Sequence, residues 1–187
     1  MDGNPATVNP FERLHVENPA YFNLIPQQGV RHAIFPETCL HNAAWDIIAT
    51  PEGRIFLSVC AELGTPSYVW LYEYLPETNE FSLHFKLEDV TFQQDCAIRP
   101  SKIHTSMAVM NDGRLIMSTH TTAEAPQHPY WLPFSFYRHQ FEGYQGSNIL
   151  MYDYNARQVE NRGIPVPFET IYGGAYDPRH HAYYFSG

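Results

Sequence analysis

Two histidines lie at equal distances from a turn in the middle of the chain. His104 comes eight residues before Asp112, and His120 comes eight residues after it. If this segment is an antiparallel hairpin that turns at Asp112, the two imidazoles face each other, or nearly so, on neighbouring strands. Imidazoles transfer protons near neutral pH and also bind metal ions. The spacing therefore predicts a site for acid–base or metal chemistry at the end of this hairpin.

The preceding hairpin is expected to bring further polar residues to the same end. Asn42 and Glu62 are each ten residues from the turn at Glu52, and His41 is next to Asn42. The expected cluster consists of His41, Asn42, Glu62, His104, His120 and Tyr172, with Lys102 and Arg99 at its rim. If a divalent metal is bound, the expected ligands are His104, His120 and Glu62. The spacings His-x-His and His-Glu-x-x-His are absent from the chain.

A long aromatic segment leaves the same end after His120. It covers residues 123–147 and is predicted to be an insertion between two strands. Candidate ligand contacts in it are Tyr130, Trp131, Arg138 and His139. Its rings could form a platform or lid over a carbohydrate, because aromatic rings stack on the apolar faces of sugars. The alternative is that the same rings pack between sheets or against residues 1–35.

The strands that must position these residues form an ordered repeat. Each copy has a hairpin, an aromatic third strand, a turn and a fourth strand. The first copy is expected at 41–61, 68–74 and 81–87, the second at 102–121, 148–154 and 159–166, and a third starts at 170 and resumes at 182–185. Such a meander of short antiparallel strands predicts an all-β fold.

The spacing of the copies indicates the architecture. We match Gly53 of the first copy to Gly113 of the second, and Tyr72 to Tyr152. The two tyrosines are further apart in the sequence than the two glycines, and the additional residues belong to the insertion. When the inserted residues are subtracted from the sequence distance between the second and third turns, a repeat unit of about 47 residues remains. This is the size of a four-stranded propeller blade. We therefore predict a β-propeller, with a β-sandwich or another barrel as the alternative.

The predicted organisation leaves the propeller incomplete. Residues 1–35 form an N-terminal arm that can include one strand at 30–35, and residues 36–187 form the partial propeller. Blade one is expected at about 41–88, blade two at about 101–167 and the start of blade three at 170–187. Two and a half blades cannot close a ring, so another chain or further C-terminal blades are expected to complete it.

Composition narrows the classes of partner and compartment. The chain has 20 acidic and 11 basic residues and a formal charge of -9, which disfavours a nucleic-acid surface. No apolar run is long enough to span a membrane. The N-terminus lacks the basic and apolar regions of a signal peptide, so a cytoplasmic location is expected. Cys39, Cys60 and Cys96 are an odd set without metal spacing, so they are expected to be small buried side chains.

Several motifs carry a resemblance to known propellers. They are Lys102-Ile103-His104-Thr105-Ser106, Asn111-Asp112-Gly113-Arg114, Ser118-Thr119-His120, Asn161-Arg162-Gly163-Ile164-Pro165-Val166-Pro167, Ile171-Tyr172-Gly173 and Tyr176-Asp177-Pro178. Residues 41–187 resemble the first two and a half blades of a seven- or eight-bladed β-propeller from a largely uncharacterised bacterial group. The paired-histidine hairpin also resembles propeller-type polysaccharide lyases that act on uronic acids.

The lyase resemblance implies roles for the histidine pair. In those enzymes the histidines, a tyrosine and an arginine neutralise the substrate carboxylate and move protons. Carried over, His104 and His120 match the pair, and Tyr172 and Arg99 are the catalytic candidates beside them, with Arg138 as another arginine. The predicted function is a carbohydrate-active propeller, such as a uronate lyase. A non-enzymatic binding or assembly scaffold and a metal-binding propeller enzyme remain the alternatives, with a carbohydrate or another small polar molecule as the ligand.

Overall fold

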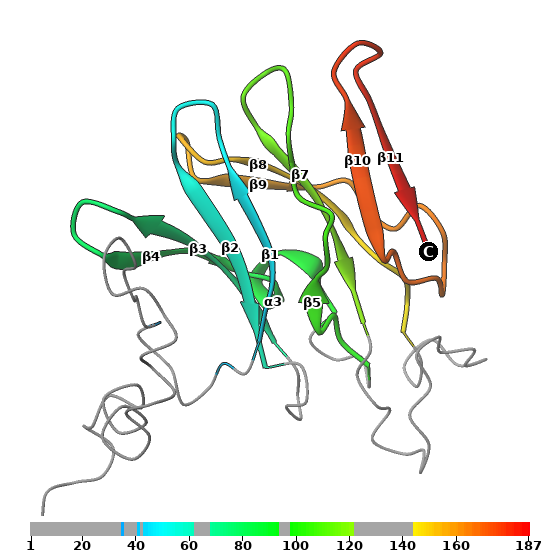
Figure 1. The fold of residues 1–187 in the computed structure, drawn as a ribbon. Helices are drawn as coiled ribbons and strands as arrows, with labels where there is room; N and C mark the ends of the chain where they lie inside the picture. Colours follow the sequence, from blue (N-terminus) through cyan, green and yellow to red (C-terminus); the bar gives the residue numbers. More distant parts are fainter. Residues whose placement is uncertain (1–34, 36–40, 42, 62–67, 94–97, 122–143) are drawn as a thin grey trace, which may run out of the picture. The chain divides into compact units, whose positions relative to one another are not determined.

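The computed structural model describes residues 35, 41, 43–61, 68–93, 98–121 and 144–187 (Figure 1). All of them belong to one compact unit within residues 33–187. The predicted N-terminal arm and its strand at 30–35 therefore lie outside the described residues, except for Phe35. The described chain is all-β and antiparallel, as predicted, with one helix of a single turn.

Sheet one is a four-stranded meander, in the order predicted for the first copy. Its strands pair as β1-β2-β3-β4. They are β1 Ala43–Ala49, β2 Ile55–Cys60, β3 Val69–Leu75 and β4 Glu80–Lys86, followed by the helix α3 Glu88–Thr91. Side chains of β3 alternate between two apolar clusters, with Val69 and Leu71 on one face and Trp70 and Tyr72 on the other. Sheet one is therefore apolar on both faces.

Sheet two repeats the meander, but its first strand is divided. The strands are β5 Lys102–Ile103, β6 Ala108–Val109, β7 Leu115–His120, β8 Ile149–Asp153 and β9 Gln158–Asn161, and β5 and β6 both pair with β7. The prediction of one continuous strand over 102–110 is wrong, because residues 104–107 leave the ladder. Sheet three contains β10 Gly173–Asp177 and β11 Ala182–Ser186.

The first two hairpins turn in the same way. Gly53 and Gly113 have φ angles of 86° and 85°, a left-handed conformation that glycine adopts without strain. The N–H of each donates to the carbonyl three residues earlier, at 2.9 Å to Thr50 and 3.0 Å to Met110. The predicted correspondence between the turns at Gly53 and Gly113 is therefore confirmed at the level of individual hydrogen bonds.

The third strands correspond with a register that differs from the prediction by two positions. Tyr74 pairs with Ile55, and Tyr152 pairs with Leu115, which takes the place of Ile55 in the second hairpin. Tyr152 is therefore equivalent to Tyr74 and not to Tyr72. Because side chains alternate with a period of two, this slip leaves the aromatic residues on the same face of each sheet. The apolar pattern predicted the correct face, and only the pairing register shows the correct position.

Apolar contacts join each sheet to the next. The core between sheets one and two includes Phe56, Leu71, Ile103, Leu115, Met117, Leu150 and Tyr152, together with the buried Cys60. A second cluster joins Ile116 and Ile149 of sheet two to Ile171 before β10 and to Tyr183 of β11. As a result, β5 lies beside β1 and β2, and β10 lies beside β6 and β7 (Figure 1). Cys39 and Cys96 lie outside the described residues.

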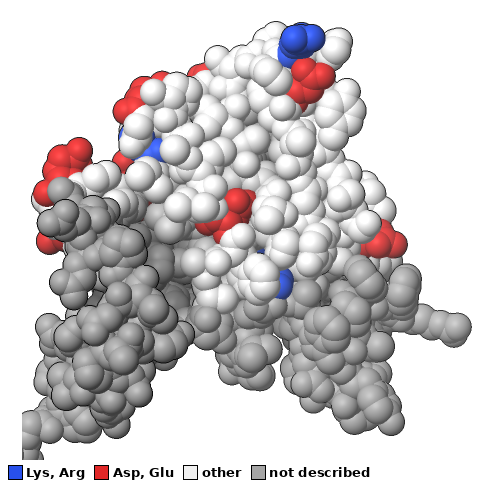
Figure 2. Space-filling model, in the orientation of Figure 1, with Lys and Arg blue, Asp and Glu red and all other residues white. Residues whose placement is uncertain are grey.

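Charged side chains are sparse on one face of the described structure. In the orientation of Figure 1, most of the described surface is uncharged, with isolated acidic and basic side chains (Figure 2). The short α3 is the one helix in the described part of the chain, and no helix there has the length and apolarity to cross a bilayer.

Gly146, where the chain re-enters sheet two, has no room for a side chain. Its φ is 124°, and a Cβ would overlap the Ile164 side chain and lie 2.8 Å from Val166 O. We expect Gly146→Ala to lower the free energy of unfolding by about 3 kcal/mol, combining left-handed strain with overpacking. Gly163→Ala is the matched control: φ is 88° but no atom lies within 4 Å, so a loss of about 1 kcal/mol is expected. Equal losses in urea unfolding would contradict this account.

Candidate functional site

The site lies where the first strands of the sheets are interrupted. In β1 the pairing passes from Ala44 with Val59 to Asp46 with Ser58, which leaves Trp45 as an extra residue. In sheet two it passes from Ile103 with Thr119 to Ala108 with Ile116, which leaves two extra residues within 104–107. Such bulges re-aim side chains and often occur near functional sites. Here they lie at corresponding places in neighbouring sheets.

The interruptions bring a row of aromatic rings together. The ring of His104 stacks on Trp45 with centroids 5.0 Å apart and an interplanar angle of 29°. The ring centroids of His104 and Tyr172 are 4.2 Å apart. His120 completes the group at 5.5 Å from His104 and 5.2 Å from Tyr172. We call Trp45, His104, His120 and Tyr172 the ring cluster; its members come from β1, from sheet two and from the residue that precedes β10.

The two histidines meet diagonally and not directly across the ladder. His120 pairs with Lys102, so the residue opposite it is two positions before His104. The turn at 110–113 would place His104 opposite His120, as predicted, but the bulge shifts the register by two positions. A shift of two preserves the face of the sheet, so both imidazoles still lie in one cluster.

Backbone carbonyls fix the tautomer of both imidazoles. His104 Nδ1 lies 2.9 Å from Tyr172 O, and His120 Nδ1 lies 3.0 Å from Ile171 O. A carbonyl can only accept a hydrogen bond, so Nδ1 of each neutral ring carries the proton and Nε2 carries the lone pair. An Nε2 lone pair can accept a proton or bind a metal. The same two bonds attach sheet two to the segment before β10.

Exposure decides which members of the ring cluster can meet a ligand. His120 and His104 are 1% and 7% exposed, whereas Trp45 and Tyr172 are 37% and 52% exposed. Lys102 is also buried, and its ammonium lies 3.8 Å from the centroid of the Trp45 ring in a cation–π contact. A ligand would therefore meet two aromatic faces, with imidazoles and a positive charge behind them.

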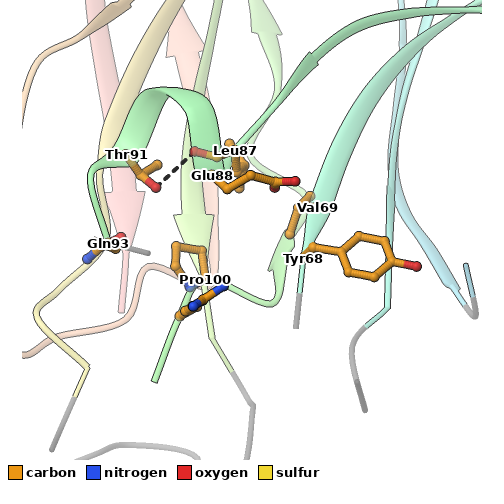
Figure 3. A pocket seen from close by; sticks show the side chains of 8 residues that line it. Tyr68, Val69, Leu87, Glu88, Thr91, Gln93 and Pro100 are labelled. Carbon is orange, nitrogen blue, oxygen red and sulfur yellow. Dashed lines mark hydrogen bonds between the residues drawn. The ribbon is translucent and has the colours of Figure 1, made fainter. Parts of the chain in front are cut away.

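Two further predicted site residues lie elsewhere. Arg99 lines a small pocket with Glu88, Gln93 and Pro100, next to α3 (Figure 3). None of the residues lining this pocket belongs to the ring cluster. His41 packs against Trp70, at 4.9 Å between centroids, on the face of sheet one turned away from sheet two. The expectation that Arg99 and His41 join the histidine pair is not met, because Arg99 lines this separate pocket and His41 packs on the far face of sheet one.

The other predicted site residues lie outside the described residues. They are Asn42, Glu62, Tyr130, Trp131, Arg138 and His139. Within the described ranges no three His, Cys, Asp or Glu side chains gather as metal ligands would. Of the predicted metal ligands, His104 and His120 lie together, and Glu62 lies outside the described residues.

Trp45 is the functional candidate that the sequence prediction missed. The step from Trp45 to His104 is only one position shorter than the step from Gly53 to Gly113. That spacing could have indicated that Trp45 and His104 occupy equivalent places on neighbouring first strands. The two steps differ by one position because β1 has one extra residue at its bulge and the first strand of sheet two has two. A search for equal spacing therefore does not find the match.

A third buried histidine, His84, lies between sheets one and two. The Tyr152 hydroxyl donates to its Nδ1, and its Nε2–H donates to Glu73 Oε2 at 2.9 Å. Burial lowers the pKa of His84 below its ordinary 6.5, and burial raises the pKa of Tyr152 to about 12. The hydrogen bond from Arg54 lowers the pKa of Glu73. This network therefore contains a neutral imidazole and a charged carboxylate.

The network should make folding sensitive to mild acid. Because the pKa of His84 is lower in the folded than in the unfolded chain, its contribution to stability is complete above about pH 6.5 and is lost as the pH falls through the folded value. We expect the free energy of unfolding to decline below that pH in the wild type, with part of the decline missing in His84→Gln. Parallel curves for the two proteins would exclude His84 as the cause.

The chain was also compared with known proteins. No family model matches it. No curated protein matches it either. Function is therefore inferred from the ring cluster and from the residues that hold it.

Proposed function

We propose that residues 43–187 form consecutive blades of a β-propeller and that the ring cluster is a carbohydrate-binding site at its inner edge. The propeller is supported by the repeated strand order, the matching hairpin turns and the apolar packing of each sheet on the next. In such a ring the first strand of each blade lines the centre. The bulges that carry Trp45 and His104 would then face the central channel.

One observation carries the proposal for carbohydrate. The exposed rings of Trp45 and Tyr172 both lie against a nearly buried imidazole, His104, with ring centroids 5.0 and 4.2 Å from it. The C–H groups on a sugar face are weakly positive and pack well on the negative face of an aromatic ring. Sites for small molecules commonly combine such apolar surfaces with a few fixed polar groups. Here the imidazoles and Lys102 are the polar groups.

The charge at the site favours an acidic sugar. Lys102 is a cationic side chain in contact with the ring cluster, and its ammonium sits on the Trp45 ring. In uronate elimination, a base removes the proton alpha to the carboxylate, the electron pair forms an enolate, and the glycosidic C–O bond then breaks. His104 Nε2 would be the base, Lys102 would stabilise the enolate charge, and Tyr172 would protonate the leaving oxygen.

A non-enzymatic binding or assembly scaffold is the second candidate. The observation that favours it is the attachment of both histidines to carbonyls next to sheet three, which is a structural role. His120, at 1% exposure, fits that role best. The scaffold would bind a sugar without eliminating it.

The test is a titration of the chain with oligogalacturonates, oligoalginates and neutral oligosaccharides of equal length. We expect calorimetry to show preferential binding of the acidic ligands, and absorbance at about 235 nm to report unsaturated products if elimination occurs. His104→Ala should weaken binding about tenfold and abolish any product, while His180→Ala in the exposed third turn should change neither. Binding without product supports the scaffold, and no binding of any of these ligands refutes a carbohydrate site.

The partner proposal concerns sheet three. Among the described residues β11 pairs only with β10. The second strands of the other two sheets, β2 and β7, also pair with the strand that follows them, β3 and β8. Tyr184 of β11 is 61% exposed. We propose that this edge accepts the remaining strands of the same blade and that this face accepts a further blade, supplied by more of the same chain or by another chain. Sedimentation that shows Tyr184-dependent association with a protein carrying the following blades would support this, and association unchanged in Tyr184→Lys would contradict it.

A further inference from the structure

We propose that Asp46 is a positioning residue for the ring cluster: its carboxylate holds the 104–107 bulge and thereby fixes His104 between Trp45 and Tyr172. The inference rests on the proposed ligand site, because it assigns a role in building that site. Asp46 itself would not touch the ligand. Its partners belong to the neighbouring sheet, so the carboxylate connects two sheets at the point where the first strand is interrupted.

The contact of Asp46 with the bulge is strong. Its Oδ2 accepts the backbone N–H of Ser106 at 2.6 Å and that of Met107 at 2.8 Å. Both groups left the ladder when the strand divided, so they need an acceptor elsewhere. Hydrogen bonds to a carboxylate are shorter and stronger than neutral ones. Burial raises the pKa of Asp46, while the two N–H groups and the nearby His104 act in the opposite direction.

Other elements hold the same bulge from different sides. Ser106 Oγ donates to Ser118 O at 3.0 Å, and Ser118 N donates to Ser106 Oγ at 3.0 Å. The hydroxyl of Tyr183, on β11, donates to Ser106 O. Gly174 N donates to Thr105 O at 3.2 Å. The bulge is thus attached to β1, β7, β10 and β11, and Asp46 supplies the only charged group among these attachments in the described structure.

The bulge contains a strained residue next to His104. Thr105 has a φ of 44°, which is rare for a β-branched residue and costs free energy. Such a conformation persists only where its surroundings enforce it. Thr105 Oγ1 lies 3.1 Å from His104 Nδ1 and donates a hydrogen bond to Tyr172 O at 3.3 Å. The strained backbone therefore directs the imidazole toward the rings, and Asp46 is the strongest of the groups that hold it there.

The experiment compares four variants in two assays. Asp46→Ala removes both hydrogen bonds to the bulge, while Asp46→Asn keeps an oxygen that can accept them. Thr105→Gly relieves the strain and loosens the bulge. Asp153→Ala is the matched control, because Asp153 Oδ1 also accepts two backbone N–H groups, from Asn155 and Ala156 at 2.9 Å, but in a turn away from the ring cluster. The assays are NMR of the His104 ring protons without ligand and calorimetry with oligogalacturonate.

The ligand-free assay tests positioning by itself. Ring currents of Trp45 and Tyr172 shift the His104 ring protons upfield in the wild type. We expect this shift to be kept in Asp46→Asn and Asp153→Ala and to be lost in Asp46→Ala. In Thr105→Gly we expect a reduced shift with stability equal to or above the wild type, which a merely structural role would not produce. An unchanged shift in both Asp46→Ala and Thr105→Gly would overturn the inference; if Asp46→Ala does not fold, Thr105→Gly alone decides.

The ligand assay separates this inference from the proposed function. Where the wild type binds, we expect at least tenfold weaker binding in Asp46→Ala and a change of less than threefold in Asp46→Asn. If no ligand binds the wild type but the ring-current shifts follow Asp46, the sugar proposal fails and the positioning role stands. If binding is equal in all variants, Asp46 does not position the site.

Discussion

Replacing Glu73 with alanine is expected to lower the free energy of unfolding by about 3 kcal/mol. Its carboxylate accepts two hydrogen bonds from the Arg54 guanidinium, at 2.6 and 2.8 Å, and a third from His84 at 2.9 Å. Glu73 is buried, so the variant leaves a charged and a neutral donor without their acceptor. Denaturant unfolding at neutral pH measures the loss.

Glu160→Ala provides the contrast for Glu73. Glu160 also pairs with two arginines, Arg114 at 3.6 Å and Arg162, but all three side chains are substantially exposed. Exposed ion pairs contribute little because water and salt screen them, so a loss of about 0.5 kcal/mol is expected. Equal losses in the two variants would show that burial does not make the Glu73 network stronger than an exposed ion pair.

Replacing Trp45 with alanine is expected to have the largest effect on ligand binding. The change removes an exposed ring face and also frees His104 from its stacking partner at 5.0 Å. Losing a stacked ring costs about 2 kcal/mol, which is about a thirtyfold increase in Kd. Trp45→Phe should keep most of the affinity, because a smaller aromatic face remains. Calorimetry is the suitable measurement, since the variant lacks the indole that a fluorescence assay would follow.

Ile47→Ala is the matched control for Trp45. Ile47 lies two residues further along β1 and is exposed, but it is not part of the ring cluster. Both changes remove a large apolar side chain from one edge strand. We expect wild-type affinity in Ile47→Ala, and equal affinities in the two alanine variants would mean that the ligand does not contact the ring cluster.

Turn chemistry and apolar alternation were sufficient to predict the sheets. Gly53 and Gly113 mark two hairpins because only glycine adopts their φ angles without strain. Strand β3 combines β-branched and aromatic residues and is buried on both faces, so its sequence indicates a strand without further context. The order of the strands within sheets one and two could therefore be predicted from local pattern.

Register and bulges could not be predicted in the same way. Counting from the turn at Asp112 assumes an uninterrupted ladder, whereas the ladder breaks at 104–107 because Asp46 and Ser118 supply hydrogen bonds from outside the strand. Two partners of Ser106, Asp46 and Tyr183, are distant in the sequence, and no local propensity reveals them. Trp45 was missed for the same reason, since its role depends on a bulge that appears only when β1 pairs with β2.

The buried network of Arg54, Glu73, His84 and Tyr152 also could not be predicted from the sequence. Arg54, Glu73 and His84 all belong to sheet one and its first hairpin, and Tyr152 comes from sheet two. Each residue alone has an ordinary interpretation as a surface or core side chain. Only the packing of the two sheets places their polar atoms together, and burial then lowers the pKa of His84.

Binding of an acidic carbohydrate to the ring cluster should change the NMR chemical shifts of the cluster's own side chains. The wild-type chain would be titrated with oligogalacturonate while NMR follows the Trp45 indole N–H and the ring protons of His104 and Tyr172. We expect saturable shifts that are largest at these three residues and absent from Arg99 in its separate pocket. Shifts confined to that pocket, or no shifts at saturating ligand, would contradict binding at the ring cluster.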